Sequence, residues 1–311
     1  MKKFKLIVTR LAHVLPILLI VSVMAFALSN MSAGDVAEVT LRSQGLTPTP
    51  EAIAAVREEL GLNNSLPQQY VLWAGKALRG DFGVSFQTGR PVTEEIMAKF
   101  PATLMLSLAA TLLSVLFAVP VALLSVRYKD SVLDHSFRVF TTAGATMPDF
   151  CLALILLYVF AIQLQIAPVI SGSDIRNIFL PALALSVGYG VMYARVLRNN
   201  LIEIRNCDYM RAARARGLGE TQTLVRHGLR NAALPCMALI GVNFGKLLGG
   251  QFVCEMIFSW NGIGKFAVDS IKLKDLPVIQ GYIIIVAAAY ILINLVLDIL
   301  YLYIDPRISI E

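Results

Sequence analysis

The chain has 311 residues, of which 57% are hydrophobic and only 15% are charged. A soluble domain is nearer half apolar and one-quarter charged, so this composition excludes a disordered chain and argues against a soluble globule. The net charge of +6 could suggest nucleic acid, but the basic residues flank long apolar blocks, which indicates membrane orientation instead.

The first apolar block covers about residues 9–29 and follows three lysines, Lys2, Lys3 and Lys5. This pattern could be a signal peptide. Because the block is near spanning length and further apolar blocks follow, we expect an uncleaved membrane anchor within a first segment, 1–29.

Residues 30–100 are polar and predict a small insertion outside the membrane. Thr49 is placed to cap a helix that has Pro50 in its first position and ends at Gly61. A second helix is predicted from Pro67 to just before Gly80.

The rest of the chain, 101–311, predicts a membrane core. A helix needs about 20 apolar residues to cross the hydrocarbon layer. Blocks near this length lie at about 101–126, 149–166, 178–197, 234–258 and 278–303.

Six spans would place both termini on one side of the membrane. Lysine and arginine gather in the terminal segments and in the segments after the second and fourth blocks, which favours the cytoplasm for both termini. The insertion 30–100 and the loops 167–177 and 259–277 should then face outward.

The sequence offers no catalytic motif. A phosphate-binding loop needs Gly-Lys followed by Ser or Thr, but Leu247 and Phe266 follow the two Gly-Lys pairs. Four scattered cysteines and three isolated histidines provide neither a disulfide framework nor metal-ligand spacing. We therefore expect no catalytic residue, no metal site and no cofactor bound by this chain.

An arginine-rich segment between the fourth and fifth blocks is the most informative part of the chain. Asp208 can cap a helix that runs to Arg216, Gly217 suits the left-handed closing position, and Leu218 can pack against that end. A second helix is expected over 220–230. Positive-inside anchoring alone would explain the arginines, but a long ordered elbow indicates a docking element for a cytoplasmic partner.

This segment resembles the coupling motif of permeases of ATP-binding-cassette (ABC) importers, in which Ala-Ala is followed by Gly and later by Leu-Pro. The matching residues are Ala212, Ala213, Gly217, Leu234 and Pro235. Arg211 stands where many members have Glu, as is common in the peptide/nickel branch.

Further stretches along the whole chain resemble the peptide/nickel branch. They are LGLNNSLPQQY, LRGDFGVSFQTGRPV, FPATLMLSLAA, FSWNGIGKFAV, DLPVIQG and DPRI. Asn261 departs from the pattern because the family usually has Pro before Gly262.

The resemblance implies an all-α membrane protein with six transmembrane helices of the type I ABC importer permease kind, in a bacterial inner membrane. It implies a pore made with a second permease subunit, as a heterodimer, two ATPase subunits that use ATP and Mg²⁺, and an extracytoplasmic binding protein. The coupling loop would be 198–233, with ATPase-coupling residues Asp208, Arg211, Ala212, Ala213, Arg216 and Gly217.

The fifth block contains candidate residues of the translocation path. Gly241, Gly245 and Gly249 share one helix face and would let helices approach closely, which can be packing alone. Lys246 lies near the middle of the block, where a charge is unfavourable unless it faces a cavity or a partner such as Asp298. We expect Lys246, Asn243, Gly245 and Gly249 to line the path.

The loop after the fifth block is aromatic and rich in glycine. We expect Trp260 at the membrane interface and the loop residues Trp260, Asn261, Gly262 and Gly264 to be exposed, with contact to the binding protein or substrate as an alternative.

Two other classes compete with this interpretation. An ion-coupled secondary transporter would need acids within the spans, of which the sequence has few, and inverted repeats, which the sequence does not show. A receptor or structural membrane protein would leave the arginine-rich elbow unexplained. For the substrate, the motifs favour nickel or a metal chelate, whereas Lys246 favours an anionic chelate or the carboxylate of a short peptide.

Overall fold

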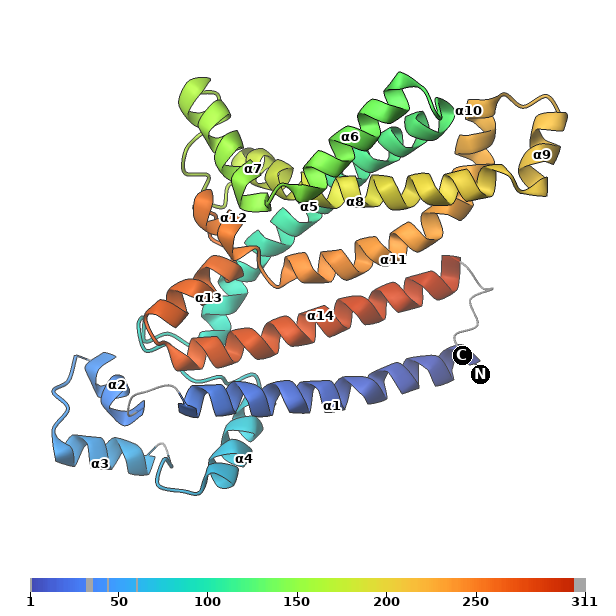
Figure 1. The fold of residues 1–311 in the computed structure, drawn as a ribbon. Helices are drawn as coiled ribbons and strands as arrows, with labels where there is room; N and C mark the ends of the chain where they lie inside the picture. Colours follow the sequence, from blue (N-terminus) through green and yellow to red (C-terminus); the bar gives the residue numbers. More distant parts are fainter. Residues whose placement is uncertain (1, 32–35, 44, 60, 305–311) are drawn as a thin grey trace. The chain divides into compact units, whose positions relative to one another are not determined.

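The computed structural model describes residues 2–31, 36–43, 45–59 and 61–304, and within them the chain is built from helices without a β-sheet. Figure 1 shows the helices in chain order. They are α1 Lys2–Met31, α2 Val36–Ser43, α3 Pro50–Glu59, α4 Leu66–Ala77, α5 Val92–Arg127, α6 Val132–Thr146, α7 Asp149–Leu156, α8 Phe179–Arg205, α9 Asp208–Ala215, α10 Glu220–Thr223, α11 Leu229–Leu248, α12 Phe252–Ile257, α13 Ile263–Lys272 and α14 Leu276–Ile304. The π-helical segments η1 Leu157–Gln163 and η3 Leu224–Gly228 and the 3₁₀ turn η2 Ile175–Asn177 complete the set.

The chain divides into two compact units. Unit 1 contains Met1–Pro101 and Gly262–Leu295, and unit 2 contains Ala102–Asn261 and Val296–Glu311. The division into 1–29, 30–100 and 101–311 stays a prediction.

Four helical segments of the described residues are long and apolar enough to cross a membrane: Val92–Arg127, Phe179–Arg205, Glu220–Leu248 and Leu276–Leu297. Helix α6 together with α7 and η1 can form a fifth span, bent by 101° at the break. The predicted first span corresponds to α1, of which the stretch Leu15–Leu28, where side chains are described, is apolar. Length and composition in the described part of the chain therefore support four or five spans, and the predicted number of six is not reached.

Two predicted boundaries are wrong. The block 234–258 is not one span, because α11 ends at Leu248 and a new helix, α12, begins at Phe252. Gly250, with φ of +87°, adopts the left-handed conformation that ends the helix. The segment 259–277 is not a plain loop either, because it contains α13.

The predicted helices of the insertion are confirmed in unit 1. The Thr49 hydroxyl accepts a hydrogen bond from the Ala52 amide at 3.3 Å, and Gly61 follows α3 with φ of +65°. Helix α4 packs on α1 through the ring of Phe26, which meets Tyr70 and Trp73 at centroid distances of 5.5 and 5.8 Å.

The segment after α4 is fixed to the start of α14 by one buried carboxylate. Asp275 accepts hydrogen bonds from the Ser85 hydroxyl at 2.5 Å and from the amides of Phe86 and Gln87 at 3.1 and 3.3 Å. This contact joins two of the stretches that carry the family resemblance, SFQTGRPV and DLPVIQG.

Unit 2 is organised around α8, which packs against α11, α6 and α7. Figure 1 shows α8 and α11 running side by side, with α9 at the end of α8. Small residues let the helices approach closely: a Cβ built on Gly190 would lie 2.9 Å from Phe117 Cδ1 and 3.2 Å from the Ser114 carbonyl oxygen.

Candidate coupling site and translocation path

The predicted elbow helix is present as α9, which covers Asp208–Ala215. Its end is a Schellman motif: the amide of Leu218 donates to the Ala213 carbonyl at 3.4 Å, and the amide of Gly217 donates to the Arg214 carbonyl at 2.9 Å. Gly217 has φ of +85°, a conformation that suits glycine. The structure confirms the role of Gly217 as the left-handed closing residue.

One face of α9 packs on the rest of unit 2. Met210 is fully buried, and Ala213, three residues later, is 7% exposed. Met210 packs in a cluster with Leu201 of α8 and Leu224 of η3. Ala213, predicted as a coupling residue, is therefore turned away from any partner and belongs to the chain's own core.

The opposite face of α9 is open. Asp208, Arg211, Ala212, Arg216 and Gly217 are all exposed, and Asp208 and Arg211 form a surface ion pair at 3.5 Å. We call this exposed set the α9 face. Small side chains at its centre and arginines at its edges would fit a narrow groove with acidic borders.

Tyr209 adds an aromatic ring to the α9 face, with 42% of its surface exposed, and its hydroxyl accepts a hydrogen bond from Asn231 of α11 at 3.1 Å. Sequence reasoning missed this residue. Its exposure depends on the burial of Met210 and Ala213 on the other face of α9, which the sequence alone does not reveal.

Polar contacts brace the elbow at both ends. The Arg205 guanidinium at the end of α8 pairs with Glu220 of α10 at 2.9 Å and donates to the Val126 carbonyl of α5 at 3.3 Å. Arg214 of α9 donates back to the Arg205 carbonyl at 3.1 Å. Helix α9 is thus tied to α8 and, through Arg205, to α10 and α5.

The position of Lys246 corrects its predicted place in mid-span. Because α11 ends at Leu248, Lys246 lies in the last turn of that helix and is exposed. A cation is favourable at a helix C-terminus, so the charge does not require burial in hydrocarbon. Its suggested partner Asp298 has a side chain outside the described residues.

Asn243 and Gly245 face the interior of unit 2, and Gly249 caps α11. Asn243 is 3% exposed and lies beside Tyr193 of α8, whose ring is fully buried. The Asn243 amide and the Tyr193 hydroxyl face each other, and among the described residues neither group has a further hydrogen-bond partner. Two buried polar groups between α8 and α11 could meet a polar molecule or water inside the bundle.

The predicted exposure of the loop after the fifth block is wrong for Trp260. Its side chain is fully buried in unit 2, where the indole N–H donates to the Ala102 carbonyl at 3.0 Å. Gly262 and Gly264 are buried as well, and Asn261 is exposed. Trp260 supports the packing of α5 and α12 and is not available to a binding protein.

These features define a helical protein with several candidate membrane spans and a braced elbow between two of them. The comparisons give the class a name. A family model described as "binding-protein-dependent transport system inner membrane component" matches residues 114–310, and the model of its N-terminal part matches residues 3–108. The chain belongs to this family of ABC importer permeases, in its peptide/nickel-type branch.

Several relatives have the same printed name, glutathione transport system permease protein GsiC. Those of Escherichia coli K12, Salmonella paratyphi A and Salmonella choleraesuis are each 35% identical over 302 residues, which is 97% of this chain and 98% of the relative. Among solved structures, an amino acid ABC transporter with histidines matches with a TM-score of 0.51 at 18% identity, covering 70% of this chain and 95% of that chain. The second likeness shows the fold.

Family membership establishes the chain as the membrane-embedded, pore-forming subunit of an importer and not its catalytic subunit. It also sets aside the ion-coupled transporter. Such permeases work with a partner permease, ATPase subunits and a binding protein in the inner membrane.

Proposed function

We propose that α9 is the coupling helix and that the α9 face inserts into a groove of an ATPase subunit, which binds ATP and Mg²⁺. The exposure of Ala212 and Gly217 beside Arg211 and Arg216 supports this assignment. In this arrangement both termini are cytoplasmic, and residues 30–100 face the binding protein. A second, different permease subunit completes the pore.

In this proposal, the contacts that hold α9 transmit the closing motion of the ATPase subunits to the membrane spans. A ligand shifts a conformational equilibrium only through contacts that differ between the two states. Because Met210 is buried and Arg214 is bonded to the end of α8, a displacement of α9 moves α8 with it. Helix α11 follows through the contact between Tyr209 and Asn231.

Docking is tested by Ala212→Asp, which places a charge at the centre of the α9 face without entering the core. Gln222→Asp, on the exposed side of α10, is the matched control. We expect Ala212→Asp to lose the co-purified ATPase subunits and uptake while Gln222→Asp keeps both. Normal assembly and uptake in Ala212→Asp would disprove the docking assignment.

For the substrate, we propose a short peptide with a free carboxylate, of the kind that glutathione represents. The exposed cation of Lys246 at the end of α11 supports an anionic ligand, and the printed name of the relatives points to a peptide. Nearby, Asn243 offers an amide inside the bundle. A nickel chelate, which the sequence motifs favour, is the alternative.

Uptake by the whole transporter separates these substrates. Competition of labelled glutathione uptake by dipeptides, Ni²⁺ alone and a Ni²⁺ chelate should show inhibition by peptides. Lys246→Met should raise the apparent KM for an anionic peptide, while Lys272→Met, an exposed lysine of α13, should not. Inhibition by the nickel chelate alone, or an unchanged KM in Lys246→Met, would contradict the proposal.

A further inference from the structure

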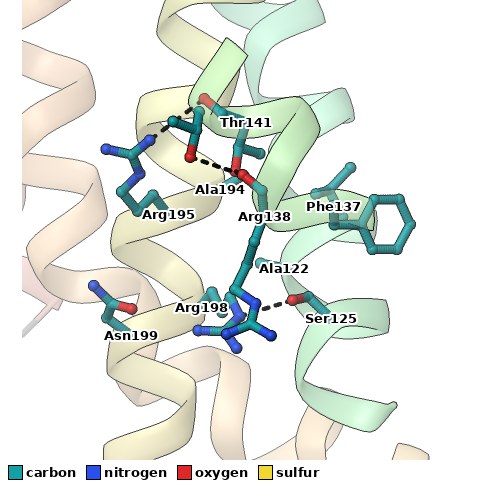
Figure 2. A pocket seen from close by; sticks show the side chains of 11 residues that line it. Ala122, Ser125, Phe137, Arg138, Thr141, Ala194, Arg195, Arg198 and Asn199 are labelled. Atoms are coloured by element: carbon teal, nitrogen blue, oxygen red, sulfur yellow. Dashed lines mark hydrogen bonds between the residues drawn. The ribbon is translucent and has the colours of Figure 1, made fainter. Parts of the chain in front are cut away.

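Unit 2 contains a basic cavity at the arginine-rich ends of α5 and α8 that the coupling site does not use. Its volume is about 260 Å³. Figure 2 shows Arg138, Arg195 and Arg198 around it, from α6 and α8. None of the eleven residues that line it, all within the described part of the chain, is acidic.

One of the three guanidinium groups is already neutralised. Arg198 donates to the fully buried carboxylate of Asp134 at 2.9 and 3.1 Å and also to the Ser125 hydroxyl at 2.7 Å. Asp134 accepts from Ser125 as well. This cluster joins α5, α6 and α8 and forms the floor of the cavity.

The other two arginines keep most of their binding capacity. Arg138 is 3.7 Å from Asp134, and half of its side chain is exposed. Arg195 is exposed. Among the described residues, its guanidinium donates a 3.4 Å hydrogen bond to the Thr141 carbonyl. The cavity therefore holds three cations against the one anion beneath it and favours an anionic ligand with several acceptor oxygens.

The rest of the cavity wall is apolar and is continuous with exposed apolar side chains on α6. Val121, Ala122 and Phe137 line the cavity beside the arginines. On the same helix as Phe137, the side chains of Leu133 and Phe140 are 53% and 54% exposed. A ligand with both an anionic group and an acyl chain would match both parts of this surface.

The depth of the cavity agrees with such a ligand. The candidate span of α8 ends at Arg205, and Arg198 lies seven residues before that end. At 1.5 Å per residue, Arg198 is about 10 Å from the end of the helix. This is near the boundary between hydrocarbon and headgroups, where basic pockets between helices bind lipid headgroups. A partner protein would instead contact the elbow beyond these helix ends.

We propose that this cavity binds one anionic phospholipid, with its phosphate on Arg138 and Arg195 and one acyl chain along Val121, Ala122 and Phe137. Arg198 holds the floor through Asp134. The bound lipid bridges α6 and α8, so it stabilises the bent segment α6–α7 against α8. This assignment is independent of the proposed coupling role.

The test uses the intact transporter, purified and exchanged into phosphatidylcholine nanodiscs with added phosphatidylglycerol, and native mass spectrometry counts the retained lipid. The double variant Arg138→Gln, Arg195→Gln should lower retention by about fivefold for each arginine removed. The control, Arg127→Gln, Lys129→Gln, removes the same charge from exposed positions outside the cavity and should retain the lipid.

A second arm identifies the source of the phosphate. Thermal unfolding in pure phosphatidylcholine is measured with inorganic phosphate and, separately, with phosphatidylglycerol. We expect stabilisation by the lipid alone, and only where both arginines are present. Equal lipid retention in the two double variants would mean that the lipid is held by general attraction to surface charge, and it would overturn the site. Stabilisation by inorganic phosphate would overturn the assignment of the ligand as a lipid.

Discussion

Asp134 in unit 2 and Asp275 in unit 1 are both buried carboxylates, but the chain satisfies them with different donors. Asp134 meets the charged guanidinium of Arg198, which comes from another helix. Asp275 receives a hydroxyl and two amides from the single segment 85–87. The first arrangement fixes helices to one another, and the second fixes the shape of a loop.

The difference matches what each region has to do. In the proposed coupling role, motion of a partner passes between helices around the elbow, and ion pairs such as Arg205 with Glu220 hold those helices together. Around Asp275, neutral hydrogen bonds shape a surface segment. Breaking the ionic brace should therefore have a larger effect than breaking the neutral one.

The largest effect is expected for Arg198→Gln. The variant removes the closest cation of the buried Asp134 and leaves only the 3.7 Å contact with Arg138, and loss of one partner of a buried ion pair destabilises a protein by about 3–5 kcal/mol. Thermal unfolding of the purified permease should show a clear loss, and the double variant with Asp134→Asn should recover most of it. Arg127→Gln is the control, because Arg127 is exposed, lies outside the cavity and has no acidic partner among the described ion pairs. Wild-type stability in Arg198→Gln would refute the brace.

A smaller effect is expected for Asp275→Ala, which removes the acceptor of the Ser85 hydroxyl and the Phe86 amide and leaves the Gln87 amide with the Ser85 hydroxyl alone. Each unsatisfied buried group is unfavourable by about 1–3 kcal/mol, reduced where water enters. Limited proteolysis should show faster cleavage in this segment. Asp269→Ala, which removes an exposed pair with Lys272, should leave the cleavage rate unchanged. Equal cleavage of both variants would show that Asp275 does not fix the loop.

The smallest effect is expected for Gly217→Ala. A Cβ there meets open space, so the change in unfolding free energy comes from the positive φ alone, at about 1–2 kcal/mol of destabilisation. Gly75→Ala, inside α4 and also open, should have the opposite sign because Ala favours a helix by up to about 1 kcal/mol. Thermal unfolding measures both. Stabilisation by Gly217→Ala would contradict the left-handed cap.

Local patterns in the sequence predicted the helix ends that depend on one residue. Thr49, Gly61 and Gly217 occupy the cap positions expected of them, because a cap needs only a neighbouring amide or a positive φ. The Ala-Ala-Gly spacing likewise predicted a short helix closed by a left-handed glycine, which α9 and Gly217 form, while its coupling role stays a prediction.

Features that depend on tertiary packing could not be predicted from the sequence. Gly249 and Gly250 end α11. In the sequence, however, a glycine within an apolar block is equally compatible with a continuous packed helix. The prediction therefore extended the span beyond Leu248 and placed Lys246 in its middle. Trp260 is buried because the Ala102 carbonyl is near its indole, a contact across 158 residues. The burial of Ala213 and the cavity around Arg195 depend on the same long-range packing.

The central claim is that α9 moves as a rigid unit with α8 and α11, and it is tested by removing the contacts that hold α9 without substituting any residue of the α9 face. Met210→Ala removes the buried anchor, and Asn231→Ala removes the contact to Tyr209. Met147→Ala, at a 43% exposed position, is the control.

The measurement is substrate uptake per ATP hydrolysed in proteoliposomes that contain the whole transporter. The account predicts that both loosening variants still bind the ATPase subunits and hydrolyse ATP, but import less substrate per ATP than the wild type and Met147→Ala. If Met210→Ala and Asn231→Ala import as much substrate per ATP as the wild type, α9 does not move as a rigid unit with α8 and α11.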